Sequence, residues 1–159
     1  MVSFLYSCQN KNVTRVSKIT ANTGMLDSIK NRADTSYIKK YPRNDFVTAE
    51  YYITRKDSTT TQVMKDAQGT VRQIISEKSK RRTYFAAFYP NGQLMASFTL
   101  DNFGQYNDSS KEFFQNGSIK SEGVYKGGLH FGKWKNYDST GKYIYTAQYD
   151  QNGQQINHQ

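Results

Sequence analysis

The stretch that decides the fold is FFQNGSIKSEGVYKGGLHFGKWKNYD, residues 113–138. Within it, the runs 119–126 and 129–135 carry β-favouring residues and flank the pair Gly127-Gly128. Two adjacent glycines permit the positive φ angles of a two-residue hairpin turn. The stretch therefore predicts an antiparallel β-hairpin.

Turn signals recur along the chain at a nearly constant interval. Gly69, Gly92, Gly117 and Gly141 are separated by 23, 25 and 24 residues, and Gly153 follows after 12, which is half that step. A fixed period of this length is typical of repeat proteins in which each unit is one supersecondary element. Because a two-stranded unit is too small to be stable alone, neighbouring units must complete one another's sheet.

The segments between these turns have the composition of strands. In the last of them, Tyr143, Tyr145, Ala147 and Tyr149 alternate with other residues and are predicted to share one face. We therefore expect a mainly β fold, an elongated antiparallel β-meander of repeated hairpins with about eight to ten strands and a short N-terminal helix or coil. The predicted strands outside the central hairpin are 46–54, 59–65, 70–77, 84–89, 94–100 and 142–150.

Aromatic residues have to supply much of the core. Leu, Ile, Val and Phe make up only 30 of the 159 residues, close to the level found in disordered chains. The 13 tyrosines and one tryptophan change that expectation, because each aromatic side chain buries a large area. A thin sheet with few fully buried positions suits this composition.

The N-terminal region differs from the repeats. Residues 1–8 are apolar and end in Cys8 before an abrupt polar switch, and Leu5-Tyr6-Ser7-Cys8 resembles a lipoprotein box. Such a signal needs a basic start and a longer apolar stretch than this one, so a start further upstream or a plain N-terminus with a free cysteine are the alternatives. We expect three parts: a signal remnant at 1–8, a polar tether at 9–44 and the repeat domain at 45–159. A short helix is expected in the tether, between residues 24 and 41.

Positive charge is concentrated in the first half of the chain. Residues 1–82 contain 16 Lys and Arg against 7 Asp and Glu, whereas residues 83–159 contain six of each. A basic front half suits an acidic partner or an anionic membrane surface. Four basic residues lie close together before an aromatic strand, but they do not alternate with the aromatics, so we do not expect nucleic acid as the partner. This basic patch comprises Lys78, Lys80, Arg81 and Arg82.

The sequence offers no catalytic or metal-binding constellation. One cysteine and two histidines cannot build a Cys/His zinc site, and no pattern implies a cofactor. His130 lies in a hairpin strand without an accompanying nucleophile, although a general base needs a partner within hydrogen-bond reach. We expect a protein that is not an enzyme.

Several aromatic residues are candidates for binding. The better surface candidates are Tyr143, Tyr145 and Tyr149, whereas Trp134 is expected to pack inside a thin sheet. The alternative for all of them is cross-strand packing that holds the hairpins together. The candidates are Tyr125, Phe131, Trp134, Tyr137, Tyr143 and Tyr145.

Residues 113–141 resemble a MORN-repeat variant. The resemblance depends on Asn116-Gly117, on Glu122-Gly123 followed by Tyr125, and on Gly132 two residues before Trp134. The full motif covers about 30 residues, parts of it extend over about 75, and it is absent before residue 45. It implies a β-meander of repeated hairpins.

The resemblance also implies a class of function. Proteins with this variant include those similar to the YwqK-type antitoxins and many envelope proteins. The resemblance therefore implies a non-catalytic module that binds a protein partner, with a toxin as the specific case. The alternative is an envelope lipoprotein anchored to the membrane through Cys8, so the cell envelope is the expected location, with the cytoplasm as the alternative.

Overall fold

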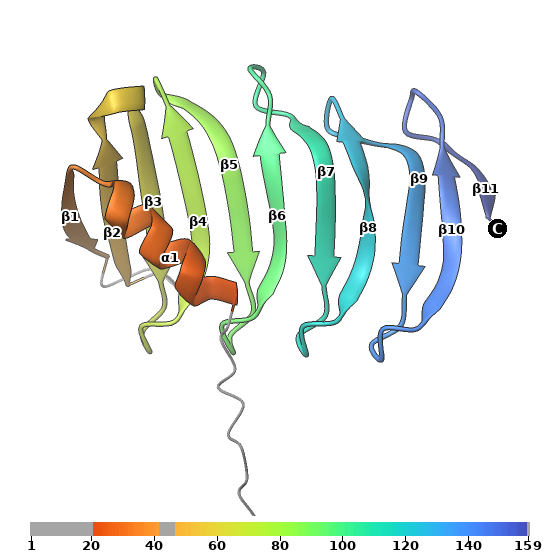
Figure 1. Cartoon of the computed structure of the whole chain (residues 1–159), viewed down its shortest axis with the longest axis horizontal. Helices are drawn as coiled ribbons and strands as arrows, with labels where there is room; N and C mark the ends of the chain where they lie inside the picture. Colours follow the sequence, from red (N-terminus) through yellow and green to blue (C-terminus); the bar gives the residue numbers. More distant parts are fainter. Residues whose placement is uncertain (1–20, 42–46, 159) are drawn as a thin grey trace, which may run out of the picture.

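The computed structural model describes residues 21–41 and 47–158; Cys8 and the rest of the predicted signal remnant lie outside the described residues. Within these residues, one α-helix, one short 3-10 helix and eleven strands follow one another (Figure 1). They are α1 (Ala21–Arg32), β1 (Thr35–Lys40), β2 (Thr48–Thr54), the short 3-10 helix η1 (Arg55–Asp57), β3 (Thr59–Lys65), β4 (Val71–Lys78), β5 (Arg81–Phe88), β6 (Leu94–Leu100), β7 (Tyr106–Phe113), β8 (Ile119–Lys126), β9 (Leu129–Tyr137), β10 (Tyr143–Tyr149) and β11 (Gln155–His158).

The strands form one open antiparallel sheet in which spatial order follows chain order from β1 to β11. This confirms the predicted β-meander with one short N-terminal helix. The helix predicted within 24–41 ends at Arg32, and Thr35–Lys40 forms β1 within the segment expected to be a tether. β1 forms because its residues pair along the full edge of β2, beginning where the Asp34 N–H donates to the Ile53 carbonyl at 2.8 Å.

The repeat glycines lie where the chain reverses. Four of them have φ near +80 to +90° and occupy the turns at the same end of the strands (Figure 1): Gly69, Gly92, Gly117 and Gly141. In each turn the glycine N–H donates to the carbonyl three residues earlier, as in a type I turn followed by a left-handed residue. Gly153 comes half a period later and therefore lies in a turn at the opposite end of the strands, between β10 and β11.

Asparagine side chains link successive turns at the end of the strands where the first four repeat glycines lie. Asn91 Nδ2 donates to the Gln115 carbonyl at 2.9 Å, and Asn116 Nδ2 donates to the Ser139 carbonyl at 2.6 Å. In each case the donor stands just before the repeat glycine and the acceptor lies in the following turn. The Asn-Gly pair thus closes its own turn and also fixes the distance to the next one.

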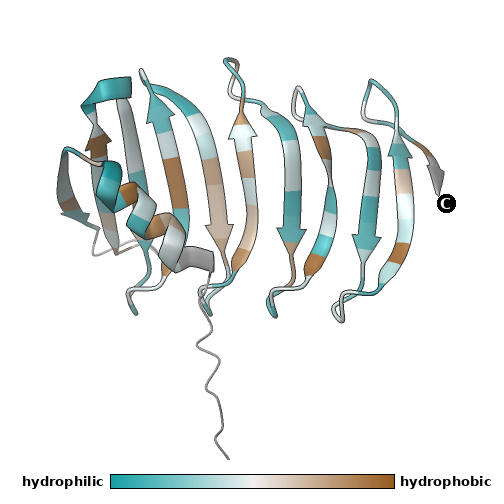
Figure 2. Cartoon of the chain, in the orientation of Figure 1, coloured by the Kyte–Doolittle hydropathy of each residue, from teal (hydrophilic) through white to brown (hydrophobic). Residues whose placement is uncertain are grey.

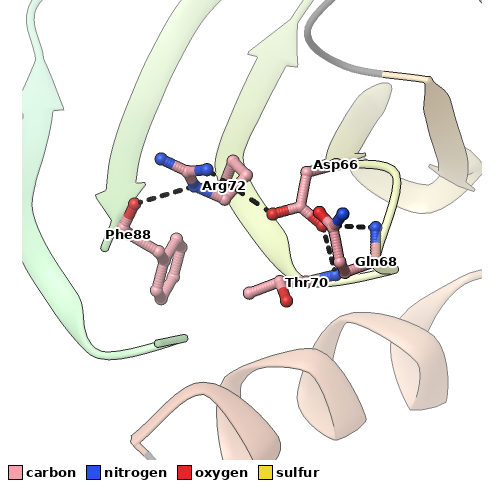
Figure 3. Close-up of polar contacts among 5 residues, drawn as sticks. All are labelled: Asp66, Gln68, Thr70, Arg72 and Phe88. Atoms are coloured by element: carbon pink, nitrogen blue, oxygen red, sulfur yellow. Dashed lines mark hydrogen bonds and ion pairs between the residues drawn. The ribbon is translucent and has the colours of Figure 1, made fainter. Parts of the chain in front are cut away.

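An aspartate closes the first of these turns. Asp66 Oδ1 accepts hydrogen bonds from the N–H groups of Gln68 and Thr70, at 3.1 and 2.9 Å (Figure 3). Arg72 lies 3.5 Å from the other carboxylate oxygen of Asp66 and donates through Nε to the Phe88 carbonyl at 3.3 Å. This arginine therefore ties the β3–β4 turn to the end of β5.

The main core lies between α1 and the β2–β5 part of the sheet. Val63, Ile74 and Phe88 are at most 2% exposed, and Met25 and Ile29 of α1 pack against this cluster. Figure 2 shows apolar residues in the middle of β4 and β5, beside the helix. We call the side of the sheet that carries α1 the helix face and the other side the open face.

In the second half of the sheet the buried side chains lie on the open face, and not on the helix face. Register across β6–β10 places the residues that are at most 7% exposed there, away from α1. The chain therefore uses both faces of one sheet, with a helix covering the first half and aromatic rings covering the second. The buried open-face residues are Ala96, Ser110, Ser121, Trp134 and Ala147.

Candidate functional site

The six aromatic candidates lie on two different faces. Tyr145 pairs with Asn136 in register with Trp134, on the open face, and Tyr125 lies there too. Phe131 pairs with Val124 on the helix face, where Tyr137 also lies. The six therefore do not form a single strip.

Tyr143 does not share a face with Tyr145, contrary to the alternation predicted from the sequence. The register of β10 against β9 shifts between these two residues, so that Tyr143 pairs with Tyr137 and Tyr145 pairs with Asn136. The rings of Tyr137 and Tyr143 meet edge to face with centroids 6.1 Å apart. The extra residue, Ile144, turns Tyr143 to the helix face, as a β-bulge does.

Ring contacts on the open face form a continuous aromatic stripe across β5–β10. Phe98 stacks on Tyr106 with centroids 4.3 Å apart, and both meet Tyr125 edge to face. His130 continues the row, 4.2 Å from Trp134 and 4.8 Å from Tyr149 between centroids. The aromatic stripe comprises Phe85, Phe98, Tyr106, Tyr125, His130, Trp134 and Tyr149.

Trp134 is the anchor of this stripe. Its side chain is only 3% exposed, and its Nε1 donates to the Val124 carbonyl at 3.1 Å. A Cβ atom at Gly123 would come within 2.3 Å of the indole ring, so the ring lies directly on the glycine backbone. These contacts support the packing interpretation of Trp134 over a binding role.

His130 is held within the stripe by packing rather than poised for proton transfer. Its Nε2 and the Tyr125 hydroxyl are 3.0 Å apart, and burial lowers the pKa of the imidazole. Burial also raises the pKa of Tyr125 to about 12, so the hydroxyl stays protonated. Within residues 21–41 and 47–158, no group of three His, Cys, Asp or Glu side chains could hold a metal ion.

The basic patch at the β4–β5 turn is exposed. Ser79 and Lys80 form the turn, with φ of 50 and 67°, and residues 77–82 are all solvent-exposed. Arg82 lines a hollow on the open face of about 480 Å³, together with Phe85 and Tyr106. Lys78 pairs with Arg81 in the register of the two strands, so these charges lie at the ends of β4 and β5, beside the turn.

A different set of basic residues gathers on the helix face beyond α1. The helix crosses the first strands of the sheet and leaves β7–β10 uncovered (Figure 1). Lys111, Lys133 and Lys135 line a hollow of about 240 Å³ there, with Glu122 between them. Lys126 lies further along β8, with its Nζ 5.1 Å from the centroid of the Phe131 ring.

Glu122 is the single carboxylate in this group. It lies 3.0 Å from Lys111 Nζ and 3.9 Å from Lys135 Nζ, and it accepts a hydrogen bond from the Tyr137 hydroxyl at 2.8 Å. The hydrogen bonds from Lys111 and Tyr137 hold the pKa of Glu122 below its ordinary value. Four lysines against one carboxylate leave this surface positively charged.

Apolar side chains are interleaved with these charges. Val124 is 40% exposed and Phe131 is 38% exposed, although both belong to the interior of the sheet rather than to a turn. We call this surface the lysine patch and define it by Lys111, Glu122, Val124, Lys126, Phe131, Lys133 and Lys135.

The sequence did not reveal the lysine patch because the second half of the chain is neutral overall. Three of its six acidic residues are used in turns, where Asp101, Asp138 and Asp150 each accept backbone hydrogen bonds through Oδ1. Those carboxylates lie in the turns at the ends of the strands, away from the lysine patch. The alternation of Lys133 and Lys135 along one strand was the available signal, since residues two apart share a face.

Comparison with known proteins identifies the repeat. Residues 109–126 and 132–151 match the MORN repeat variant, which confirms the resemblance over residues 109–151. MORN repeat modules are typically non-catalytic. Neither the curated proteins nor the solved structures include a significant match to the chain. In the part of the chain that the structure describes, no helix is long and apolar enough to cross a membrane.

Proposed function

We propose that this chain is a non-catalytic module that binds an acidic protein partner through the lysine patch. The observation that carries the proposal is a surface with four lysines and one carboxylate, interleaved with exposed Val124 and Phe131. It lies on the same face as α1, which crosses the first strands of the sheet. Exposed apolar side chains among like charges are typical of interaction surfaces.

The geometry favours a partner that lies along the sheet beside α1. α1 packs Met25 and Ile29 against the strands beneath it, and Val124 and Phe131 are presented on the same face further along. A partner segment with apolar and acidic side chains would extend the layer that α1 begins. The lysines favour acidic partners and speed association, and the apolar side chains contribute the burial.

A binding experiment with matched variants tests this proposal. The tagged full chain is used to capture partners from a nuclease-treated lysate of the native host, alongside a variant in which Lys111, Lys133 and Lys135 are changed to Gln. The control changes Lys78, Lys80 and Arg81 to Gln, which removes the same charge from the β4–β5 turn and the strand ends beside it.

The wild type and the control are expected to retain one stoichiometric protein, and the lysine-patch variant is expected to lose it. Because exposed charges are screened by salt, retention by the wild type should also fall as salt is raised. The proposal fails if the wild type recovers no stoichiometric protein or if both triple variants bind equally. A protein that is retained from an untreated lysate but not from the nuclease-treated one would indicate a nucleic-acid partner instead.

Within this function, a toxin is the specific partner that we propose. An antitoxin-like module would occlude the active surface of the toxin with its lysine patch. Co-expression with the product of an adjacent toxin-like reading frame tests this role, since the wild type should restore growth and the lysine-patch variant should not. Equal rescue by both proteins would remove the antitoxin role.

A second candidate function is that of an envelope lipoprotein, favoured by Leu5-Tyr6-Ser7-Cys8. Acylation of Cys8 would attach the module to the membrane, because each buried methylene contributes about 0.8 kcal/mol. Metabolic labelling with an alkyne fatty acid tests it, with Cys8→Ser as the control. Label on the wild type and none on the variant is the expected result; a soluble, unlabelled wild type contradicts it. Flotation with anionic vesicles in the absence of the lipid separates a membrane-binding protein surface from the anchor.

A further inference from the structure

β1 is a long, regular and uncovered edge strand. It pairs with β2 over six residues without a register shift, and among the described residues β2 is its only neighbour in the sheet. All six of its residues are exposed, including Tyr37 at 47% and Ile38 at 63%. An edge of this kind is a template for a further strand unless proline, a bulge or charge prevents pairing.

The opposite edge of the sheet is less suitable. β11 spans only Gln155–His158, and its pairing with β10 contains a register shift. β1 contains neither proline nor a bulge, and its charges, Lys39 and Lys40, are confined to one end. The capacity for further pairing therefore lies mainly at β1.

The hydrogen bonds of β1 determine which of its residues face outward. The Tyr41 N–H donates to the Val47 carbonyl at 2.8 Å, and the register continues without a break through Tyr37 opposite Tyr51. Because antiparallel strands alternate between bonded and non-bonded pairs, Tyr37 directs its backbone groups toward β2. Ser36 and Ile38 then direct theirs toward the free edge.

We propose that β1 pairs with β1 of a second copy of this chain, antiparallel, about a twofold axis that passes beside Tyr37. In this register Ser36 of one copy lies opposite Ile38 of the other, and these residues exchange backbone hydrogen bonds in both directions. Tyr37 lies opposite Tyr37 as a non-hydrogen-bonded pair. The two sheets become one continuous sheet with an isologous interface.

Charge selects this register. Asp34 directly precedes β1, and its Oδ2 accepts the Arg55 N–H of its own chain at 2.6 Å, which leaves Oδ1 for a cation. In this register Asp34 lies opposite Lys40 of the second copy, twice by symmetry, and Thr35 lies opposite Lys39. Centring the pair on Ile38 would keep the same faces aligned but would place Lys40 opposite Ser36 and leave Asp34 without a cation. The edge thus supplies both the acid and the base, which favours a second copy over an unrelated strand.

Aromatic stacking also continues across the proposed junction. Tyr37 is stacked on Tyr51 with ring centroids 4.7 Å apart and planes 7° from parallel. Neighbouring strands lie about 4.8 Å apart, so the Tyr37 ring of the second copy falls at the next step of the stack. This interface is independent of the lysine patch, which lies on β7–β10.

Cysteine cross-linking in the full chain tests the pairing and its register, with Cys8→Ser as the background. Tyr37→Cys is expected to form an intermolecular disulfide, since Cα atoms in such a pair are about 4.5 Å apart. Thr35→Cys is the control, because the two Thr35 positions are separated by about four residues along the strand, roughly 13 Å. Cross-linking of both variants equally, or of neither, overturns the proposal.

Sedimentation velocity over a concentration series supplies a measurement without cysteines. The wild type is expected to form dimers and no larger species. Lys40→Glu should weaken the dimer about tenfold by placing two acids opposite each other, and adding Asp34→Lys should restore most of the affinity. A wild type that is monomeric throughout, growth beyond dimers, or a double variant no tighter than Lys40→Glu would each overturn the proposal.

Discussion

Replacing Gly123 by Ala gives the sharpest test of how the second half of the sheet is held together. The added Cβ would lie 2.3, 2.4 and 2.6 Å from three ring atoms of Trp134. Carbon atoms in favourable contact are about 3.5–4.0 Å apart, so the indole must move by more than about 1 Å. Gly123 is not among the residues with positive φ, so the expected effect comes from the collision and not from backbone strain.

The size of the effect follows from what Trp134 would lose. Its side chain is 3% exposed, its ring meets Tyr125 and His130 at 4.9 and 4.2 Å between centroids, and its Nε1 donates to Val124. Overpacking a core site costs about 1–3 kcal/mol, and a lost buried hydrogen bond adds about 1 kcal/mol. We expect Gly123→Ala to lower the free energy of unfolding by about 2–4 kcal/mol.

Urea unfolding followed by fluorescence measures this loss, because Trp134 is the only tryptophan of the chain. The control is the same substitution at Gly24, in α1, where an added Cβ meets nothing within 4 Å. Glycine in a helix is less favourable than alanine, so Gly24→Ala should stabilise the protein by about 0.5–1 kcal/mol. A loss below about 0.5 kcal/mol for Gly123→Ala would refute the packing argument.

Three further predictions concern the turns and the two titrating groups. Asn116→Ala should lower the free energy of unfolding by about 1 kcal/mol because it removes the hydrogen bond to the next turn. The control, Asn102→Ala at an exposed turn position, should change it by less than about 0.5 kcal/mol. Equal losses in urea unfolding would contradict a stabilising role for the asparagine links between turns. The pKa of Glu122 is lowered in the folded state, so its contribution to stability is complete above the ordinary value of 4.5 and is lost as the pH falls through the folded pKa. Glu122→Gln should therefore reduce the acid sensitivity of unfolding below pH 4.5, and an unchanged pH profile would count against it. The pKa of His130 lies below 6.5, so the folded state resists protonation and loses stability as the pH falls below that value; an NMR titration with a His130 pKa above 6.5 would contradict this.

The sequence was sufficient for the architecture because each turn signal is local. Gly92 and Gly117 have to adopt positive φ, and the glycine pair 127–128 joins Lys126 directly to Leu129. Such positions can be recognised without knowing the rest of the structure. Strand order then follows from chain order, since short turns leave neighbouring strands adjacent in the sheet.

The sequence predicted less well which face of the sheet each side chain points to. One extra residue in a strand reverses that assignment for every residue beyond it. The register shift in β10 separates Tyr143 from Tyr145, and a second irregularity at Gly132, with φ of 68°, lies next to Trp134. Register errors of this kind are invisible in an alternating pattern. β1 was missed for a related reason, since Thr35–Lys40 pairs with one strand only and carries no buried residue.

The charge of the lysine patch depends on where the acidic residues lie in the fold, which composition does not reveal. Asp138 and Asp150 accept hydrogen bonds from the backbone of their own turns, whereas Glu122 lies on a face among lysines. A net charge of zero over the second half is therefore compatible with a strongly basic surface. Counting charges along a chain shows the charge of a segment, and only the sheet shows the charge of a face.

The matched repeat motif builds both faces at once, which lets core and surface vary separately. Gly123 provides the flat backbone on which Trp134 packs on the open face, while the adjacent Glu122 holds Lys111 and Tyr137 on the helix face. Side chains of neighbouring residues in a strand point to opposite faces, so a change at Lys133 leaves the indole and its glycine undisturbed. A chain built on this motif can therefore keep one fold while its surface side chains vary, which is why the proposed partner is to be sought through the lysine patch and not through the repeat.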